Sequence, residues 1–348
     1  MALAAALALL LTGCSWMDGS YVSVVPHQVG HGQNTEGAAR QVRSYMELRN
    51  ALVGMIEEGI PEGLFSLAEY PGEQAVADMD RAVEYAMNTY PIGSYAVEAI
   101  DYDFGTGLGA SAISVDITYR RSREELSRIR TVRGRSGIQT AIADALDECA
   151  QTLVMQVAGY QETDFSGYVR EYALLNPDRV IETPAVSVRL YPDRGDPRVV
   201  ELVFQYRSDR ETLRAMRAEV QPVFSSAALY VSGQAADETK FAQLQVFLME
   251  RFDYTLGTSA TPAYDLLCRG LGDSRAFAQI YACMCRRIGL EALTVSGSRN
   301  GEPHWWNLVK VDGVWRHLDL LASAQFQCLT DEEMTGYGWD RNGYPAAE

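Results

Sequence analysis

The sequence of 348 residues contains almost no lysine, no cluster of basic residues and no apolar stretch of the ~20 residues needed to cross a membrane. Lys240 and Lys310 are its only lysines, and 46 acidic residues against 30 basic ones give a net charge of −16. Nucleic acid is therefore excluded as a main partner, because phosphate binding needs clustered positive charge. The length and the 47% of hydrophobic residues predict a globular protein of two or three domains, at roughly 150 residues each.

The six cysteines lack the spacing of a disulfide framework or of a Cys-x-x-Cys metal site. We interpret the five that follow Cys14 as mostly buried thiols, which behave as small hydrophobic side chains. They are Cys149, Cys268, Cys283, Cys285 and Cys328. No metal and no cofactor is predicted.

The chain begins with a short apolar run. Residues 2–11 are alanines and leucines, and Leu11-Thr12-Gly13-Cys14 follows in the manner of a bacterial lipobox. We predict that residues 1–14 are a signal peptide with lipidation at Cys14, and that residues 15–35 are a polar tether. The lipid would hold the protein on the outer face of the cytoplasmic membrane. The alternative is a cleaved signal with an incidental cysteine, which predicts a secreted protein.

An internal repeat at an offset of 87 residues marks the middle of the chain. Tyr119-Arg120 recurs as Tyr206-Arg207, and Arg123 and Glu124 recur as Arg210 and Glu211. The apolar alternation that precedes each tyrosine also recurs, as half-buried strands require. We therefore predict two helix–strand–strand–helix units, at about 73–133 and 163–220, within a duplicated α/β region over residues 36–235.

Two further helices are predicted to support these units, near 36–58 and 137–157, from apolar residues at helical spacing. A glycine-rich run at 105–109 joins two predicted strands with no helix after it, so we interpret it as a hairpin turn and not as a phosphate-binding loop.

The repeat ends near residue 235, and residues 236–348 are predicted to form a separate domain. We expect a helix near 237–252, a loop over 257–272, and a second helix that begins around Asp273. Three strand-like runs follow, and they are 290–296, 304–311 and 314–320.

The dipeptide Asp312-Gly313 between the last two runs is a strong signal for a two-residue hairpin turn. Such a turn places Val311 opposite Val314. Continuing the register away from the turn places Trp306 opposite Asp319.

The same register predicts that His304 and Asp319 are diagonal neighbours on one face of the hairpin. A carboxylate that accepts a hydrogen bond from an imidazole fixes the tautomer and leaves the other ring nitrogen free as a base. His317, opposite Leu308, is too far along the strand to share this contact. We expect it to be a solvent-side or packing histidine.

Three ordered motifs in the last third of the chain resemble those of the transglutaminase-like superfamily of papain-like thiol enzymes. The motifs are Gly272-x-x-x-x-Phe277-Ala278 at a helix start, His304-x-Trp306-Asn307-x-Val309, and Asp312-Gly313-x-Trp315-x-x-x-Asp319. The match covers about 240–322. The resemblance implies a domain in which one helix packs on a small antiparallel sheet, and a nucleophile–His–Asp triad.

The family places its nucleophilic cysteine four residues before the motif alanine, and this chain has Ser274 at that position. His304 and Asp319 match the family histidine and aspartate, and Trp306 and Asn307 match the flank of the histidine motif. A serine hydroxyl is far more basic than a thiol, so the nucleophile is the weak member of this triad.

Other cysteines are poor substitutes for the missing nucleophile. Cys268 could approach His304, but it lacks the helix N-terminal position that lowers a thiol pKa. Cys283 and Cys285 lie about two to three turns down the predicted helix, too far away to serve. Trp305 is a candidate ligand-binding residue, because Trp305, Trp306 and Trp315 could form an aromatic wall of a groove. The alternative is that this cluster is simply part of the core.

The sequence thus predicts an α+β protein with a duplicated α/β region and a transglutaminase-like C-terminal domain. The leading hypothesis is a surface lipoprotein whose degenerate domain binds a peptide or a cell-wall amide without efficient catalysis. One alternative is an active amide hydrolase or acyl transferase that uses Ser274, or Cys268, with His304 and Asp319. Another is a structural surface module that interacts through its duplicated units.

Overall fold

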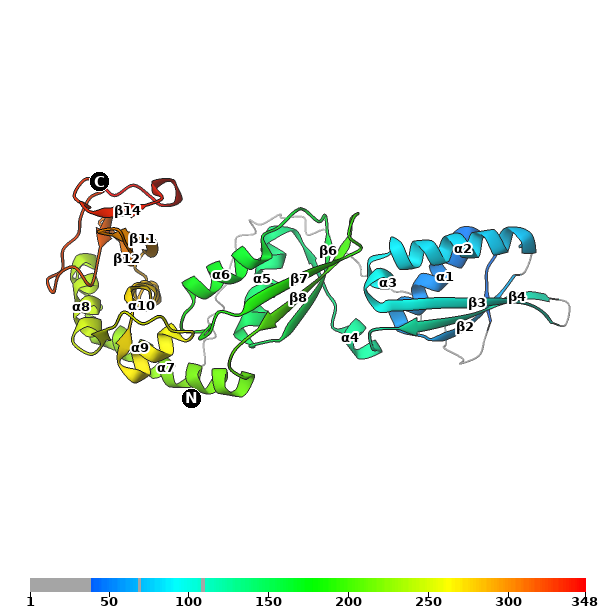
Figure 1. The fold of residues 1–348 in the computed structure, drawn as a ribbon, viewed down its shortest axis with the longest axis horizontal. Helices are drawn as coiled ribbons and strands as arrows, with labels where there is room; N and C mark the ends of the chain where they lie inside the picture. Colours follow the sequence, from blue (N-terminus) through cyan, green and yellow to red (C-terminus); the bar gives the residue numbers. More distant parts are fainter. Residues whose placement is uncertain (1–38, 68–69, 108–109) are drawn as a thin grey trace, which may run out of the picture.

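The computed structural model describes residues 39–67, 70–107 and 110–348, which form three lobes in a row (Figure 1). It has the mixed helix-and-sheet composition that the sequence predicts, so the α+β class is confirmed. The predicted signal peptide, the lipidation residue Cys14 and the tether at 15–35 lie outside the described residues. None of the described helices is long and apolar enough to span a membrane.

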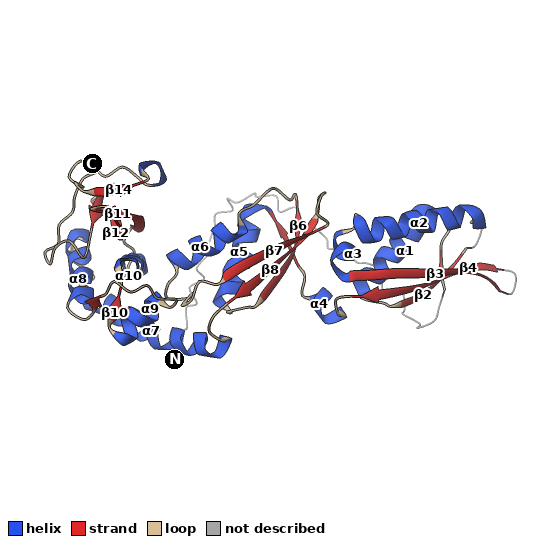
Figure 2. Ribbon diagram, viewed as in Figure 1, coloured by secondary structure: helices blue, strands red, loops and turns tan. Residues whose placement is uncertain are grey.

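The first lobe is a four-stranded sheet with helices on one face (Figure 2). Its strands lie in the order β1-β2-β4-β3; β1 runs parallel to β2, and the other pairs are antiparallel. The elements are β1 (Arg40–Gln41), α1 (Tyr45–Glu58), β2 (Glu62–Ser66), α2 (Gly72–Asn88), α3 (Pro91–Ala96), β3 (Val97–Gly107) and β4 (Ala110–Tyr119). Apolar residues of α1 and α2 pack on the sheet and form the core of this lobe.

The second lobe repeats this topology. Its sheet has the order β5-β6-β8-β7, with the first pair parallel and the other two antiparallel. The elements are β5 (Arg130–Arg133), α5 (Gly134–Asp147), β6 (Thr152–Ala158), α6 (Phe165–Leu175), β7 (Ala185–Tyr191) and β8 (Arg198–Gln205). The short helix α4 (Arg123–Ser127) joins the two lobes.

Each topological unit begins earlier than the repeat in the sequence indicates. The units run from 40 to 119 and from 130 to 205, since each includes a parallel strand and a helix that precede the region of detectable repetition. The predicted helix at 36–58 begins only at Tyr45.

The helix predicted at 137–157 is wrong in its second half, because α5 ends at Asp147 and residues 152–158 form β6. Leu153 and Val157 lie on one face in either conformation, four residues apart. Met155 is buried with them, and this period of two is the mark of the strand.

The third lobe holds the C-terminal helices and a second kind of sheet. The helices are α7 (Arg210–Tyr230), α8 (Asp237–Met249), α9 (Pro262–Arg269) and α10 (Ser274–Arg287). The four-stranded sheet has the order β13-β12-β11-β14, and its strands are β11 (Ala292–Arg299), β12 (Glu302–Val311), β13 (Val314–Leu318) and β14 (Tyr337–Trp339). The short parallel pair β9 (Asp253–Tyr254) and β10 (Leu271–Gly272) precedes α10.

Helix α10 is the central element of this lobe, buried along most of its length against the sheet and the other helices. The hairpin register predicted from the sequence is confirmed, since Val311 pairs with Val314 and Leu308 with His317. The segment expected to be a loop over 257–272 contains α9, which begins at a proline and ends before Gly270 in the left-handed conformation.

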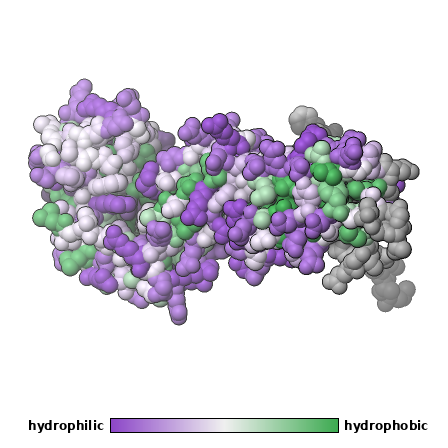
Figure 3. Space-filling model, turned by 45° about the vertical axis from the view of Figure 1, so that its right-hand side comes forward, coloured by the Kyte–Doolittle hydropathy of each residue, from purple (hydrophilic) through white to green (hydrophobic). Residues whose placement is uncertain are grey.

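The surface agrees with the acidic, polar composition. Figure 3 shows hydrophilic side chains over much of the visible face, with smaller hydrophobic areas among them. These areas interrupt the polar surface in each lobe.

A buried carboxylate connects the first two lobes. The side chain of Glu201 on β8 is only 4% exposed and lies 2.7 Å from the guanidinium of Arg121, which follows β4. That guanidinium also lies over the ring of Tyr95 on α3, which packs edge to face against Tyr191 of β7. The contacts stabilise one orientation of the two sheets.

We expect Arg121→Gln to lower the free energy of unfolding by roughly 3 kcal/mol, because it leaves Glu201 buried without its closest cation. Arg189→Gln is the matched control: Arg189 is 63% exposed and 3.7 Å from the same carboxylate. Its loss should cost less than about 1 kcal/mol. Chemical denaturation measures both, and equal effects would contradict the role given to Arg121.

Candidate functional site

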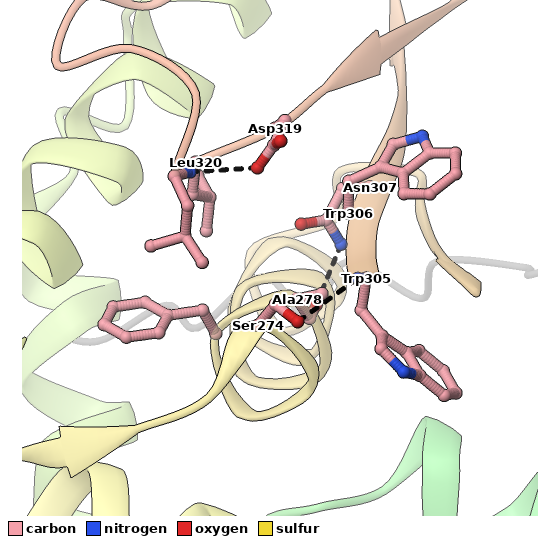
Figure 4. A pocket seen from close by; sticks show the side chains of 9 residues that line it. Ser274, Ala278, Trp305, Trp306, Asn307, Asp319 and Leu320 are labelled. Atoms are coloured by element: carbon pink, nitrogen blue, oxygen red, sulfur yellow. Dashed lines mark hydrogen bonds between the residues drawn. The ribbon is translucent and has the colours of Figure 1, made fainter. Parts of the chain in front are cut away.

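Ser274 is the first residue of α10. The preceding residue, Asp273, caps this helix by accepting a hydrogen bond from the backbone N–H of Ala276 at 2.8 Å. Ser274 is therefore at the positive end of the helix dipole, where unpaired N–H groups stabilise an anion. Its Oγ accepts a hydrogen bond from the backbone N–H of Trp305 on β12 at 3.3 Å (Figure 4). This contact joins the helix start to the sheet.

His304 and Asp319 form the pair that the hairpin register predicts. Nε2 of His304 lies 2.8 Å from Oδ2 of Asp319, and both residues are buried. Among the described residues, no hydrogen bond joins the hydroxyl of Ser274 to His304. The structure thus brings the three predicted residues to one region but links only two of them directly.

Two residues that the sequence analysis missed also hold Asp319. The hydroxyl of Tyr337 donates to its Oδ2 at 2.6 Å, and the guanidinium of Arg299 lies 3.4 Å from the same oxygen. Burial raises the pKa of Asp319, but the hydrogen bonds from His304 and Tyr337 outweigh it and hold the pKa below its usual value. Asp319 is thus a carboxylate at neutral pH.

Trp306, His317 and Asp331 form a second polar network, separate from that of His304, Asp319 and Tyr337. The indole Nε1–H of Trp306 donates to Nδ1 of His317 at 2.9 Å, and Nε2 of His317 lies 2.8 Å from Oδ1 of Asp331. Since an indole can only donate, Nδ1 must accept, and the ring proton lies on Nε2 facing the carboxylate. His317 is fully buried. The solvent-side expectation is therefore wrong, and the packing alternative agrees with the structure.

The three predicted binding residues lie in different environments. Trp305 is half-buried and lies at the crevice beside Ser274, with the guanidinium of Arg275 over its ring. Trp306 is 1% exposed and forms part of the core of the sheet, so it does not form an open aromatic wall with Trp305.

Asn307 has no exposed surface, and its orientation is fixed. Its Nδ2 donates to the carbonyl of Ala278 on α10 at 2.8 Å and to that of Leu293 on β11 at 3.1 Å. The amide oxygen is thereby turned away from these carbonyls, and it has no hydrogen-bond partner among the described residues. It is part of the lining of a narrow crevice shared with Ser274 and Asp319 (Figure 4).

The cysteines of the described chain do not offer a reactive thiolate. Burial raises the pKa of each of them, the opposite of what a nucleophilic thiol requires. Cys268 lies in the last turn of α9, at the negative end of that helix dipole. Cys283 and Cys285 are buried within α10, as the sequence predicts.

Comparison with known proteins identifies the class of this lobe. Residues 225–320 match the family model described as the transglutaminase-like superfamily. The C-terminal part of the chain is thus a transglutaminase-like domain, and the matched range includes Ser274, His304 and Asp319. No curated protein matches the chain.

Solved structures with some similarity share little sequence with this chain. A protein named TGase is 14% identical, with a TM-score of 0.28 over 49% of this chain and 51% of the other. A proposed cysteine protease from Cytophaga hutchinsonii is 14% identical, with a TM-score of 0.27 over 48% and 72%. A proposed protease from Parabacteroides distasonis is 9% identical, with a TM-score of 0.25 over 75% and 40%. The alignment spans about half the length of the first of these proteins.

We predict that the neutral form of His317 contributes to stability. Burial lowers its pKa below the ordinary value of 6.5, so the folded state takes up the imidazole proton less readily than the unfolded state. The contribution is fully present above pH 6.5 and is lost as the pH falls toward the folded pKa, with a slope of at most about 1.4 kcal/mol per pH unit.

An NMR titration of the imidazole measures this pKa, and His317→Gln assigns the resonance. The same substitution should lower stability at pH 7 and reduce the loss between pH 7 and pH 5. A folded pKa above 6.5 would contradict the prediction.

Proposed function

We propose that the transglutaminase-like domain binds an amide ligand, a peptide or a cell-wall peptide, in the crevice beside Ser274 without efficient catalysis. The protein would act as a surface lipoprotein anchored at Cys14, or otherwise as a secreted protein. The observation on which this proposal rests is the position of Ser274 and the partner of its hydroxyl. This residue stands where the family has its nucleophilic cysteine, and its hydroxyl contacts the Trp305 amide instead of His304.

The chemistry of serine supports a non-catalytic role. A thiol with a pKa near 8.5 is ionised by a neighbouring imidazole and a helix N-terminus, whereas a hydroxyl needs a general base in direct hydrogen-bond contact. Loss of one member of a triad typically lowers the rate by several orders of magnitude. His304 and Asp319 therefore support ligand binding more readily than turnover in this domain.

The groups around the crevice favour an amide ligand. The amide oxygen of Asn307 is buried and unpartnered, which costs free energy. The crevice is too narrow here for a water molecule, so a ligand N–H would recover this cost once the crevice opens. The carboxylate of Asp319 and the hydroxyl of Ser274 are further acceptors within the same lining. The half-buried ring of Trp305 offers an apolar surface next to them.

One alternative remains supported by a specific observation. The 2.8 Å contact between His304 and Asp319 orients the imidazole as a general base requires. An acyl transferase or hydrolase that uses Ser274 is therefore the second candidate. The ligand-binding hypothesis and this one differ in whether the wild-type protein consumes the peptide.

We predict that the wild-type protein binds a short peptide amide saturably and that Trp305→Ala weakens the binding roughly tenfold, the effect of removing an aromatic contact. Trp315→Ala is the matched control, because Trp315 lies on the neighbouring strand and outside the crevice lining. Calorimetric titration with an alanyl dipeptide amide and with a cell-wall peptide measures both variants. An equal loss in both, or no binding by the wild type, would oppose the proposal.

We also predict that Ser274→Cys creates a reactive thiol. The helix N-terminus and the nearby imidazole both favour the thiolate, so the introduced thiol should be alkylated by iodoacetamide at neutral pH faster than Cys283 or Cys285. Adding His304→Ala should remove most of this advantage. Mass spectrometry of the labelled peptides gives the rates.

Peptide hydrolysis by Ser274→Cys but not by wild type would support the degenerate-enzyme interpretation. Turnover by the wild type that Ser274→Ala abolishes would instead establish the serine as the working nucleophile.

A further inference from the structure

The end of helix α1 forms a closed corner in the first lobe. Gly59 has a left-handed φ of 65°, and its N–H donates to the carbonyl of Ile56, while the N–H of Ile60 donates to that of Met55. The hydroxyl of Tyr119 lies 3.1 Å from the carbonyl of Met55 and 3.0 Å from that of Ile60, so it is fully engaged. Glycine is the usual residue at such a helix end.

The side chain of Arg123 closes this corner directly over Gly59. A Cβ atom placed on Gly59 would lie 3.2 Å from both Cβ and Cγ of Arg123. The corner thus has room for the arginine because a glycine lies beneath it.

The end of helix α5 in the second lobe has the same backbone pattern with a different residue. The N–H of Cys149 donates to Leu146, and that of Ala150 donates to Ala145. Cys149 also has a left-handed φ, of 51°, which an L residue with a side chain rarely adopts. Cys149 therefore occupies the place that Gly59 has in the first lobe.

Tyr206 and Arg210 stand at the same spacing as Tyr119 and Arg123, but the corner around them is open. The hydroxyl oxygen of Tyr206 is fully buried and has no hydrogen-bond partner among the described residues. A cavity of about 220 Å³ lies at this point, where β8 leads toward α7. Its lining includes Cys149, Gln151, Gln205, Tyr206, Ser208 and Arg210. Cys149 has a side chain where Gly59 has only a hydrogen. This side chain occupies the space that the aliphatic part of Arg210 would need to close the corner as Arg123 does in the first lobe.

The residues that line the cavity include one positive charge and no negative charge. A tyrosine, a serine, two glutamines and an arginine among them can donate hydrogen bonds, and no Asp or Glu belongs to the lining. Arg214 and Arg217 add positive charge near the thiol of Cys149, and Asp147 opposes them with a smaller effect. Burial raises the pKa of Tyr206, and so does the charge of Glu182, whose carboxylate already accepts hydrogen bonds from the backbone N–H groups of Arg207 and Ser208.

We propose that this cavity binds a small carboxylate ligand. Its volume of about 220 Å³ holds several water molecules, which suits a small organic acid. Nε of Arg210 already donates to the carbonyl of Glu148, which leaves the terminal nitrogens for the two carboxylate oxygens. The hydroxyl of Tyr206 is buried beside the cavity, and once this side chain moves toward the ligand it donates to the same carboxylate and gains the partner it lacks. This site is separate from the Ser274 crevice and does not depend on the function proposed for it.

Ligand-observed NMR on the full chain tests this proposal with benzoate as the probe and benzamide as the uncharged control of equal shape. Benzoate should bind saturably and benzamide should not. Tyr206→Phe and Arg210→Gln should each weaken benzoate binding at least tenfold. The matched substitutions in the first lobe, Tyr119→Phe and Arg123→Gln, should leave it unchanged.

Thermal unfolding supplies a readout that needs no ligand. Tyr206→Phe should leave the Tm unchanged or raise it, because its buried hydroxyl has no partner to lose, whereas Tyr119→Phe should lower it. Failure of benzoate to bind at millimolar concentration would overturn the proposal. So would binding that persists in both Tyr206→Phe and Arg210→Gln, or binding of inorganic phosphate in place of the carboxylates.

Discussion

The amide of Asn307 holds together the two elements on which the candidate site depends. It donates to the carbonyl of Ala278 on α10 and to that of Leu293 on β11, from a position with no access to water. Removing it would leave both carbonyls buried without this donor, which costs about 1–3 kcal/mol for each that stays unsatisfied. The helix that begins with Ser274 is thereby fixed against the strand that carries His304. The spacing between serine and imidazole follows from this clamp.

The same sheet holds a second histidine–carboxylate pair, and Trp306 separates the two. Its ring lies nearly parallel to His304 at a centroid distance of 6.3 Å, while its N–H fixes the tautomer of His317. A buried polar network of this kind is stable only when nearly every donor and acceptor is paired. This requirement explains why Trp306 is enclosed in the core, although it also belongs to the lining of the narrow crevice beside Ser274. The amide oxygen of Asn307 is the exception in this region, since it is buried and has no hydrogen-bond partner among the described residues.

The sequence predicted the parts of the site that follow from local geometry. A two-residue turn at Asp312-Gly313 fixes the register of its hairpin, and the register alone brings His304 to Asp319. Tyr337 was missed because β14 joins the sheet through a long irregular segment that carries no register information. Arg299 was missed because β11 continues to this residue, beyond the predicted strand at 290–296. Distance along the chain, more than chemistry, set the limit of the prediction.

The same limit explains the errors in the middle of the chain. The stripe from Ile138 to Val157 fits a helix throughout, and only the left-handed conformation at Cys149 divides it into a helix and a strand. A cysteine gives no signal for that conformation, whereas a glycine at the same place would have. The topology shared by the two sheet units is visible only once their parallel first strands are seen to pair.

The row of lobes also determines where the crevice lies relative to the start of the described chain. The chain enters at β1, in the lobe at one end, and the Ser274 crevice lies in the lobe at the other, with the second sheet unit between them (Figure 1). The ion pair between Glu201 and Arg121 stabilises the junction between the two sheet units. If the chain is anchored through its N-terminal end, as proposed above, the two sheet units act as a spacer. They place the crevice at the opposite end of the row from β1, where the described chain begins.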